Sequence, residues 1–250
     1  MSSNGQGHRP VALITGAARR IGATIARRLH AAGYDLALHF RNSRADLDAL
    51  IADLERERAA STLALHAELD DTGQLAPMVE AVRTRFGRLD ALVNNASAFY
   101  ATPIATATSA QWDELFGANA RAPFFLAQAA APHLAERRGA IVNIVDIYAE
   151  RPLPGYGIYC MSKAALAMMT QALARDLAPA VRVNGVAPGA ILWPESGKSY
   201  ADQQQVIERT PLKRTGTPDD IAATVLWLLR DAPFVTGEIV RVDGGRHLTF

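Results

Sequence analysis

A tyrosine and a lysine four residues apart, Tyr159 and Lys163, form the pair in this sequence best suited to acid-base chemistry. On a helix this spacing puts both side chains on one face, so that the ammonium lies near the phenol. A free phenol, with a pKa of about 10, is a poor acid-base catalyst at neutral pH, and a neighbouring cation lowers that pKa. Without other evidence, the same spacing also fits a tyrosine and a lysine on a half-exposed helix face that have no catalytic role. Beside a redox cofactor, it predicts proton transfer at Tyr159.

Residues 15–22, with the sequence TGAARRIG, join an apolar run to a helical pattern and predict a turn that holds a pyrophosphate. Backbone N–H groups and the positive end of a helix bind anions at such a turn. An ordinary turn in which Gly22 serves only packing is the alternative, but the position after the first strand favours a dinucleotide. The residues expected to line the nucleotide are Gly16, Arg19, Arg20, Ile21 and Gly22.

The stretch after the second predicted strand indicates which nucleotide binds. NAD-binding turns carry an acidic residue there for the ribose 2′-hydroxyl, whereas this sequence has Arg41, Asn42 and Ser43, with Arg19 on the turn above. Two charge-assisted hydrogen bonds to a 2′-phosphate, at about 1.5 to 3 kcal/mol each, would favour NADPH over NADH by about a hundredfold or more. NADPH is therefore the predicted cofactor, with ordinary surface arginines as the alternative.

Short apolar runs alternate with helical patterns along the chain. The runs predict seven strands, at residues 11–14, 36–38, 63–65, 91–93, 140–145, 181–186 and 239–242. Helical patterns lie between them at 22–32, 43–60, 72–86, 109–134, 158–177 and 218–229. The alternation predicts an α/β fold, a doubly wound parallel (Rossmann) sheet in a single domain over residues 10–250. Residues 1–9 are polar and are expected to form a disordered N-terminal lead.

Composition restricts the class of protein. The 26 basic and 25 acidic residues give a net charge of +1, which disfavours nucleic acid as a partner. The longest apolar run near the C-terminus, at 221–229, is too short to span a membrane. The single cysteine, Cys160, cannot form an internal disulfide, and the N-terminus has no apolar signal core, so a cytoplasmic protein is expected. The histidines have no metal-ligand spacing, and no metal is expected.

Taken together, these motifs resemble the short-chain dehydrogenase/reductase family over nearly the whole chain. The resemblance rests on residues 15–22, 94–96, 188–189 and 242–245, with Asn119, Tyr159 and Lys163. It implies that Tyr159 donates the proton, that Lys163 also holds the nicotinamide ribose, and that Asn119 organises a water-linked proton path. It also implies a homotetramer built through the two long helices that carry Asn119 and Tyr159. The further cofactor contacts that it implies come from Glu68, Leu69, Asn94, Asn95, Ala96, Pro188 and Gly189.

Three departures from the family pattern are those of its pteridine reductases. Arg20 replaces the middle glycine of the first motif, Ser97 replaces the glycine of Asn-Asn-Ala-Gly, and Asp146 stands where a serine is expected, 13 positions before Tyr159. An ionised aspartate would repel the ketone oxygen that a serine hydroxyl holds, whereas a Tyr159–Asp146 pair can be refilled with protons from solvent and protonate a ring nitrogen. The sequence therefore predicts a reductase of dihydropterins or dihydrofolate, with oxidised pterin or folate as further substrates.

The resemblance also implies how a flat pterin would bind. Phe99 would stack on one face of the ring while the nicotinamide covers the other, and Ser97 and Arg20 would bind polar ring atoms and phosphate. Leu192 and Trp193 begin a segment, residues 192–198, interpreted as a flap over the substrate or as an ordinary surface loop. The alternatives for the other two residues are a core position for Phe99 and a turn-capping role for Asp146.

Two rival functions follow from the same residues. The first is a short-chain reductase of small carbonyls or 3-oxoacyl thioesters, which a serine at position 146 would have favoured. The second is a non-catalytic NADP-binding regulator, which predicts loss of the proton-transfer residues, yet Asn119, Tyr159 and Lys163 are all present. Arg246, near the C-terminus, is a candidate to reach a neighbouring subunit's site.

Overall fold

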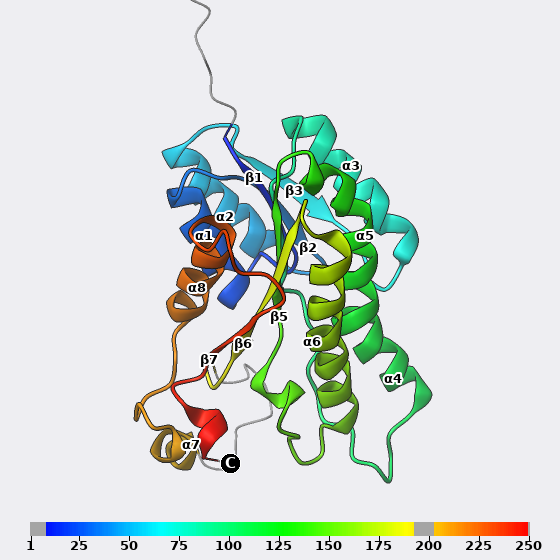
Figure 1. Cartoon of the computed structure of the whole chain (residues 1–250), viewed down its shortest axis with the longest axis vertical. Coiled ribbons are helices and arrows are strands. Elements are labelled where there is room, and N and C mark those ends of the chain that lie inside the picture. Colours follow the sequence, from blue (N-terminus) through cyan, green and yellow to red (C-terminus); the bar gives the residue numbers. More distant parts are fainter. Residues whose placement is uncertain (1–8, 193–202, 250) are drawn as a thin grey trace, which may run out of the picture.

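Seven parallel strands form one sheet at the centre of the molecule, which the computed structural model describes at residues 9–192 and 203–249 (Figure 1). The strand order is β3-β2-β1-β4-β5-β6-β7. The strands are short and mostly buried because helices cover both faces of the sheet, which is why their sequences are continuous apolar runs. Their bounds are β1 (Val11–Ile14), β2 (Asp35–Phe40), β3 (Thr62–His66), β4 (Ala91–Asn94), β5 (Ala140–Ile144), β6 (Arg182–Pro188) and β7 (Ile239–Val242).

The helices divide between the two faces of this sheet (Figure 1). One face is covered by α1 (Arg20–Ala31), α2 (Arg44–Glu57) and α8 (Pro218–Arg230), whose apolar residues share one core with the strands. The other face is covered by α3 (Leu75–Phe86), α5 (Ala122–Ala135) and α6 (Gly157–Leu177). The predicted doubly wound α/β fold is confirmed.

Three segments differ in detail from the predicted elements. The predicted helix 109–134 consists of α4 (Ser109–Phe116) and α5, joined by a π-helical turn, η2 (Gly117–Arg121), that contains Asn119. The predicted helix 72–86 opens with a 3-10 turn, η1 (Thr72–Gln74), before α3. A short helix that the sequence pattern did not predict, α7 (Gln203–Arg209), precedes α8.

The parallel arrangement gathers the predicted site at one edge of the sheet. All strands point the same way, so their carboxyl ends meet, and the order changes direction between β1 and β4. The residues singled out in the sequence follow the ends of β1, β2, β3, β4, β5 and β6 or lie on α6 and η2. No helix within the described ranges has both the length and the apolar character to cross a bilayer.

Candidate active site

The phenol of Tyr159 and the carboxylate of Asp146 are joined by a hydrogen bond of 2.6 Å from Oη to Oδ2. Asp146 follows β5 and begins a 3-10 turn, η3 (Ile147–Ala149), where its Oδ1 accepts the backbone N–H of Tyr148 at 2.9 Å. Asp146 therefore caps a turn and contacts the tyrosine at the same time. Burial raises the pKa of the Asp146 carboxyl, and the hydrogen bonds from Tyr159 and Tyr148 oppose that rise. The two groups form one coupled proton-sharing pair.

Lys163 lies one turn further along α6, on the same side as Tyr159. Its Nζ is 6.0 Å from the centre of the Tyr159 ring and donates to the carbonyl oxygen of Ile144 at 2.9 Å. The side chain is buried, and desolvation lowers the pKa of its ammonium to about 8. The i, i+4 spacing thus brings a cation close to the phenol, where it favours the ionised form of that phenol.

Asn119 fixes the loop after β4 to α6 through all four positions of its side-chain amide. Its Oδ1 accepts from Ser97 Oγ at 3.0 Å and from the Ala98 N–H at 2.9 Å. Its Nδ2 donates to the Ala98 carbonyl at 3.0 Å and to Ser162 Oγ at 2.9 Å. Ser162 in turn donates to the carbonyl of Tyr159 at 2.7 Å. The amide acts here as a structural link, and the π turn directs it inward, as such turns often do at functional sites.

Phe99 lies directly beside Tyr159. Its ring is stacked on Tyr156, with centroids 4.9 Å apart, and meets the Tyr159 ring edge-on at 4.7 Å. The side chain is still 37% exposed, so it is not a simple core residue. Thr102 binds the same pair of loops together, since its N–H donates to the Gly155 carbonyl at 2.7 Å.

The turn between β1 and α1 is tightly packed around two glycines. Gly16 adopts φ of +62°, and a Cβ at Gly22 would lie 2.1 Å from the Gly16 carbonyl oxygen, so neither position accepts a side chain without a shift of the backbone. Asn95 holds this turn by donating to the carbonyls of Thr15 and Gly16, both at 2.9 Å. The side chain of the N-cap residue, Arg19, forms no capping hydrogen bond to α1, and the positive N-terminal end of a helix attracts an anion. The residues fit the predicted dinucleotide.

Arg20 keeps the conformation of the glycine that it replaces. Its φ is +54°, in the left-handed region that favours glycine. The side chain is exposed and lines the groove described below.

A buried histidine that the sequence did not mark joins the ends of three strands. His39 on β2 accepts the Gly16 N–H at Nδ1, 3.1 Å away, and its Nε2 is 3.1 Å from the carbonyl of Ala67 after β3. Burial lowers the pKa of His39 to about 4, so the ring is neutral and carries its proton on Nε2. His39 therefore links the turn at Gly16, which follows β1, to the end of β3.

These strand ends enclose a groove with a volume of about 580 Å³. Arg41 lies on its rim and forms an ion pair with Glu68, with Nε 3.0 Å from Oε2, while Arg19 lies 3.8 Å from Asp46. The sequence did not predict that a carboxylate reaches Arg41. The predicted residues that line the groove are Gly16, Arg19, Arg20, Ile21, Gly22, Arg41, Asn42, Ser43, Glu68, Leu69, Asn95, Ala96, Ser97 and Phe99.

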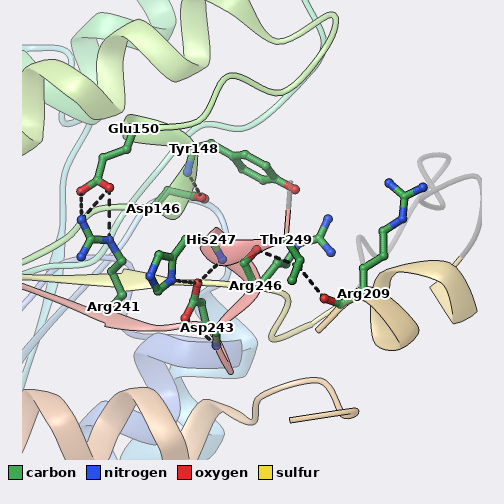
Figure 2. A network of polar contacts seen from close by, with 10 residues as sticks. Asp146, Tyr148, Glu150, Arg209, Arg241, Asp243, Arg246, His247 and Thr249 are labelled. Atoms are coloured by element: carbon green, nitrogen blue, oxygen red, sulfur yellow. Dashed lines mark hydrogen bonds and ion pairs between the residues drawn. The ribbon is translucent and has the colours of Figure 1, made fainter. Parts of the chain in front are cut away.

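The ends of β6 and β7 complete the edge of the sheet. Gly189, after Pro188, has no room for a side chain because a Cβ would lie 2.7 Å from the backbone of Asp243. Asp243 is buried and accepts hydrogen bonds from the backbone N–H groups of Gly245 and His247 and from the His247 ring. Figure 2 shows this turn beside the Arg241–Glu150 ion pair. The packing against Asp243 explains the glycine at 189 without any cofactor.

Arg246 is held by its own chain, and the expected flap is described only at its first residue. Arg246 lies on η4 (Arg246–Leu248), where it donates to the Val206 carbonyl of its own chain at 3.4 Å. Trp193 and positions 193–198 of the expected flap lie outside the described residues, and Leu192 is half-exposed at the boundary. Within the described ranges, no three His, Cys, Asp or Glu side chains gather as a metal site requires.

Comparison with known proteins identifies a family and several relatives. The family model described as Enoyl-(Acyl carrier protein) reductase matches residues 16–247. Pteridine reductase 1 of Leishmania tarentolae is 36% identical over 96% of this chain and 97% of its own length. "Granaticin polyketide synthase putative ketoacyl reductase 2" of Streptomyces violaceoruber is 38% identical, over 96% of each chain. The 3-oxoacyl-[acyl-carrier-protein] reductase FabG of Staphylococcus epidermidis is 33% identical over 95% of this chain and 98% of its own.

Proposed function

Because this chain belongs to the short-chain dehydrogenase/reductase family, whose members are NAD(P)-dependent oxidoreductases, we propose that it is an NADPH-dependent pteridine reductase. Its substrates are dihydropterins or dihydrofolate, reduced to the tetrahydro form, with oxidised pterin or folate as further substrates. The cofactor supplies a hydride to a ring carbon of the pterin when it is bound. The chain itself supplies the proton and the pocket.

The observation that carries this proposal is the 2.6 Å hydrogen bond between Tyr159 and Asp146. A ketone reductase needs a neutral donor beside its tyrosine, because the developing oxyanion is repelled by a carboxylate. A C=N bond needs a proton on nitrogen, and a carboxylate bonded to the phenol can return a proton to it from solvent after each turnover. The acid at position 146 therefore favours a heterocycle over a ketone.

The surrounding residues support proton delivery from Tyr159. Lys163, with its lowered pKa, stabilises the phenolate that remains after the proton has left. Phe99 stands at the edge of the Tyr159 ring and offers an exposed aromatic surface beside the reacting centre. Stacking of two aromatic rings adds about 0.5 to 1.5 kcal/mol to the binding free energy beyond the burial of apolar surface. A flat pterin would gain this term against Phe99, and a flexible acyl chain would not.

The predicted cofactor contacts become a proposal for NADPH. Gly16, Gly22 and the N–H groups of α1 would hold the pyrophosphate, and Lys163 would bind the nicotinamide ribose. Arg19, Arg41, Asn42 and Ser43 stand at the groove where a 2′-phosphate would lie. Arg20 and Ser97 would contact phosphate and polar pterin atoms, as the resemblance implies.

The second candidate is a 3-oxoacyl thioester reductase. The comparisons support it as much as the first candidate, since the ketoacyl reductases are as similar to this chain as the pteridine reductase is. A non-catalytic NADP-binding regulator is disfavoured, because the complete Asp146, Tyr159 and Lys163 cluster would serve no purpose in it.

We also propose a cytoplasmic homotetramer with one Rossmann domain per chain over residues 10–250. Its interface would be the outer face of the two long helical segments that carry Asn119 and Tyr159. Large apolar side chains are exposed there, among them Phe124, Phe125 and Met168.

A parallel assay tests the choice of substrate. The decrease in NADPH absorbance is followed with dihydrobiopterin, dihydrofolate and an acetoacetyl thioester, for the wild type and for Asp146→Ser. We expect the wild type to turn over the pterins, and the serine variant to lose about a hundredfold of that activity and to gain activity with the thioester. Activity of the wild type with the thioester alone would replace this proposal with the second candidate.

A further inference from the structure

The ion pair between Arg41 and Glu68 is the feature of the groove that the proposed chemistry leaves unexplained. The residues are far apart in the sequence but meet because β2 and β3 pair in register, with Phe40 opposite His66. The residues just beyond each strand therefore lie side by side, and Arg41 Nε comes within 3.0 Å of Glu68 Oε2. The backbone N–H of Glu68 donates to Gln74 Oε1 at 3.1 Å, which fixes the backbone from which the Glu68 carboxylate extends.

The two members of this ion pair suit different nucleotides. An arginine at this point suits the 2′-phosphate of NADPH, whereas a carboxylate accepts the ribose 2′-hydroxyl of NADH. The charged residues that line the groove are also equal in number, with the cations Arg19, Arg20 and Arg41 and the carboxylates of Glu68, Asp70 and Glu114. An incoming phosphate thus meets an arginine already neutralised by its neighbour.

We propose that Glu68 limits the preference for NADPH over NADH by competing with the 2′-phosphate for Arg41. This inference rests on the proposed use of NADPH at this groove. Arg41 and Glu68 are 60% and 40% exposed, so their pair is weak and separates readily when a ligand arrives. The carboxylate stays anchored nearby and repels a phosphate of charge about −1.5 to −2. Repulsion of this kind between near neighbours in a wet groove would lower NADPH affinity by about threefold to tenfold.

The uncharged 2′-hydroxyl of NADH responds differently. It is not repelled by Glu68 and can donate a hydrogen bond to it. Removal of the carboxylate is therefore expected to raise NADPH affinity while leaving NADH affinity unchanged or lower. Removal of the arginine is expected to lower NADPH affinity and to leave NADH affinity unchanged or higher.

Calorimetric titration of the full chain with NADPH and with NADH, without a second substrate, tests the proposal. The variants are Glu68→Gln and Arg41→Gln, with Asp53→Asn as the matched control. Asp53 is also the carboxylate of an exposed ion pair, with Arg27, but it does not line the groove. We expect Glu68→Gln to lower the Kd for NADPH by about threefold to tenfold, more at low salt than at high salt, and Asp53→Asn to change neither Kd.

The outcomes separate this proposal from the proposed function. A ratio of NADH to NADPH Kd that stays the same or falls in Glu68→Gln would overturn it, provided that thermal unfolding shows the variant folded as stably as the wild type. A shifted ratio with no turnover of any pterin would support the role of Glu68 and remove only the substrate class. Failure of the wild type to bind either nucleotide would overturn both.

Discussion

The hydroxyl of Tyr159 is the group on which turnover should depend most directly. Replacement by phenylalanine removes the donor to Asp146 and keeps the ring that packs on Phe99. Positioned proton donors contribute about 10² to 10⁴ in rate, so we expect turnover with dihydropterin to fall by at least about a hundredfold. The Kd for NADPH, measured by titration, should not change.

A matched control for this variant is Tyr34→Phe. Tyr34 is a buried tyrosine in the core between the sheet and α1, away from the carboxyl edge. The Tyr34→Phe variant should keep most of the wild-type turnover. Equal activity of Tyr159→Phe and Tyr34→Phe would mean that the phenol donates no proton.

The depressed pKa of Lys163 predicts an alkaline limit of activity. Desolvation lowers that pKa to about 8, so the ammonium loses its proton as the pH rises through 8 and no longer supports the Tyr159 phenolate. We expect kcat/KM for dihydropterin, which reports the free enzyme, to decline above about pH 8. A profile flat to pH 9.5, with the circular dichroism spectrum unchanged, would contradict this role.

The same shift has the opposite consequence for stability. The unfolded chain holds its lysine proton up to about pH 10.4, whereas folded Lys163 releases it near 8. Between these values the unfolded state binds more protons, so the contribution of Lys163 to the free energy of unfolding rises with pH. Loss of activity above pH 8 is therefore not a sign of unfolding at this residue.

At the scale of elements, the glycine turn between β1 and α1 should tolerate no side chain at position 22. Gly22→Ala would press a Cβ to within 2.1 Å of the Gly16 carbonyl and 2.7 Å of Asn95 Nδ2. Overpacking of this kind costs about 1 to 3 kcal/mol. We expect urea unfolding to show that loss and NADPH titration to show weaker binding.

Gly157, at the start of α6, is the matched control because a Cβ there would meet nothing within 4 Å. Gly157→Ala should be as stable as the wild type or more stable by up to about 1 kcal/mol, since alanine restricts the unfolded chain. If both variants lose the same stability, the close approach of Gly22 to Gly16 does not explain the glycine.

The elements predicted from sequence are those whose pattern is local. The all-apolar run at 11–14 and the helical period at 158–177 follow directly from residue types, and so does the Tyr159–Lys163 pairing. The π turn around Asn119 gives no such signal, because its five residues continue the helix on both sides. Family resemblance marked Asn119, but only the fold reveals that its amide joins the Ala98 loop to Ser162.

Contacts between separate strands were the part of the site that the sequence could not predict. His39 reaches Gly16 and Ala67 because of how β1, β2 and β3 align, and strand register cannot be read from residue spacing. The Arg41–Glu68 pair escaped prediction for the same reason. A buried polar residue within an apolar strand, as His39 is, was the available signal.

At the scale of the whole molecule, the exposed apolar residues of α5 and α6 predict self-association. Phe124, Phe125 and Met168 are 42%, 38% and 64% exposed, and large apolar side chains that form a contiguous exposed patch mark an interaction surface. We expect sedimentation to give about four times the 26.9 kDa of one chain. Met168→Glu should shift the protein to smaller species, because a charge would be buried at the contact.

Ile104→Glu is the control for this change. Ile104 is 98% exposed on the segment between β4 and α4 and belongs to neither helix, so the mass should not change. A monomeric wild type, or equal dissociation by both variants, would contradict the helical interface.

The residues proposed for nucleotide discrimination and those proposed for proton transfer lie at opposite halves of the sheet. Arg41 and Glu68 follow β2 and β3, whereas Asp146 follows β5 and Tyr159 lies on α6. Free-energy changes at such separated sites add. If both assignments hold, a change of electron carrier made at the ends of β2 and β3 is expected to leave the acid beside α6 unaltered, so the two properties can be engineered separately.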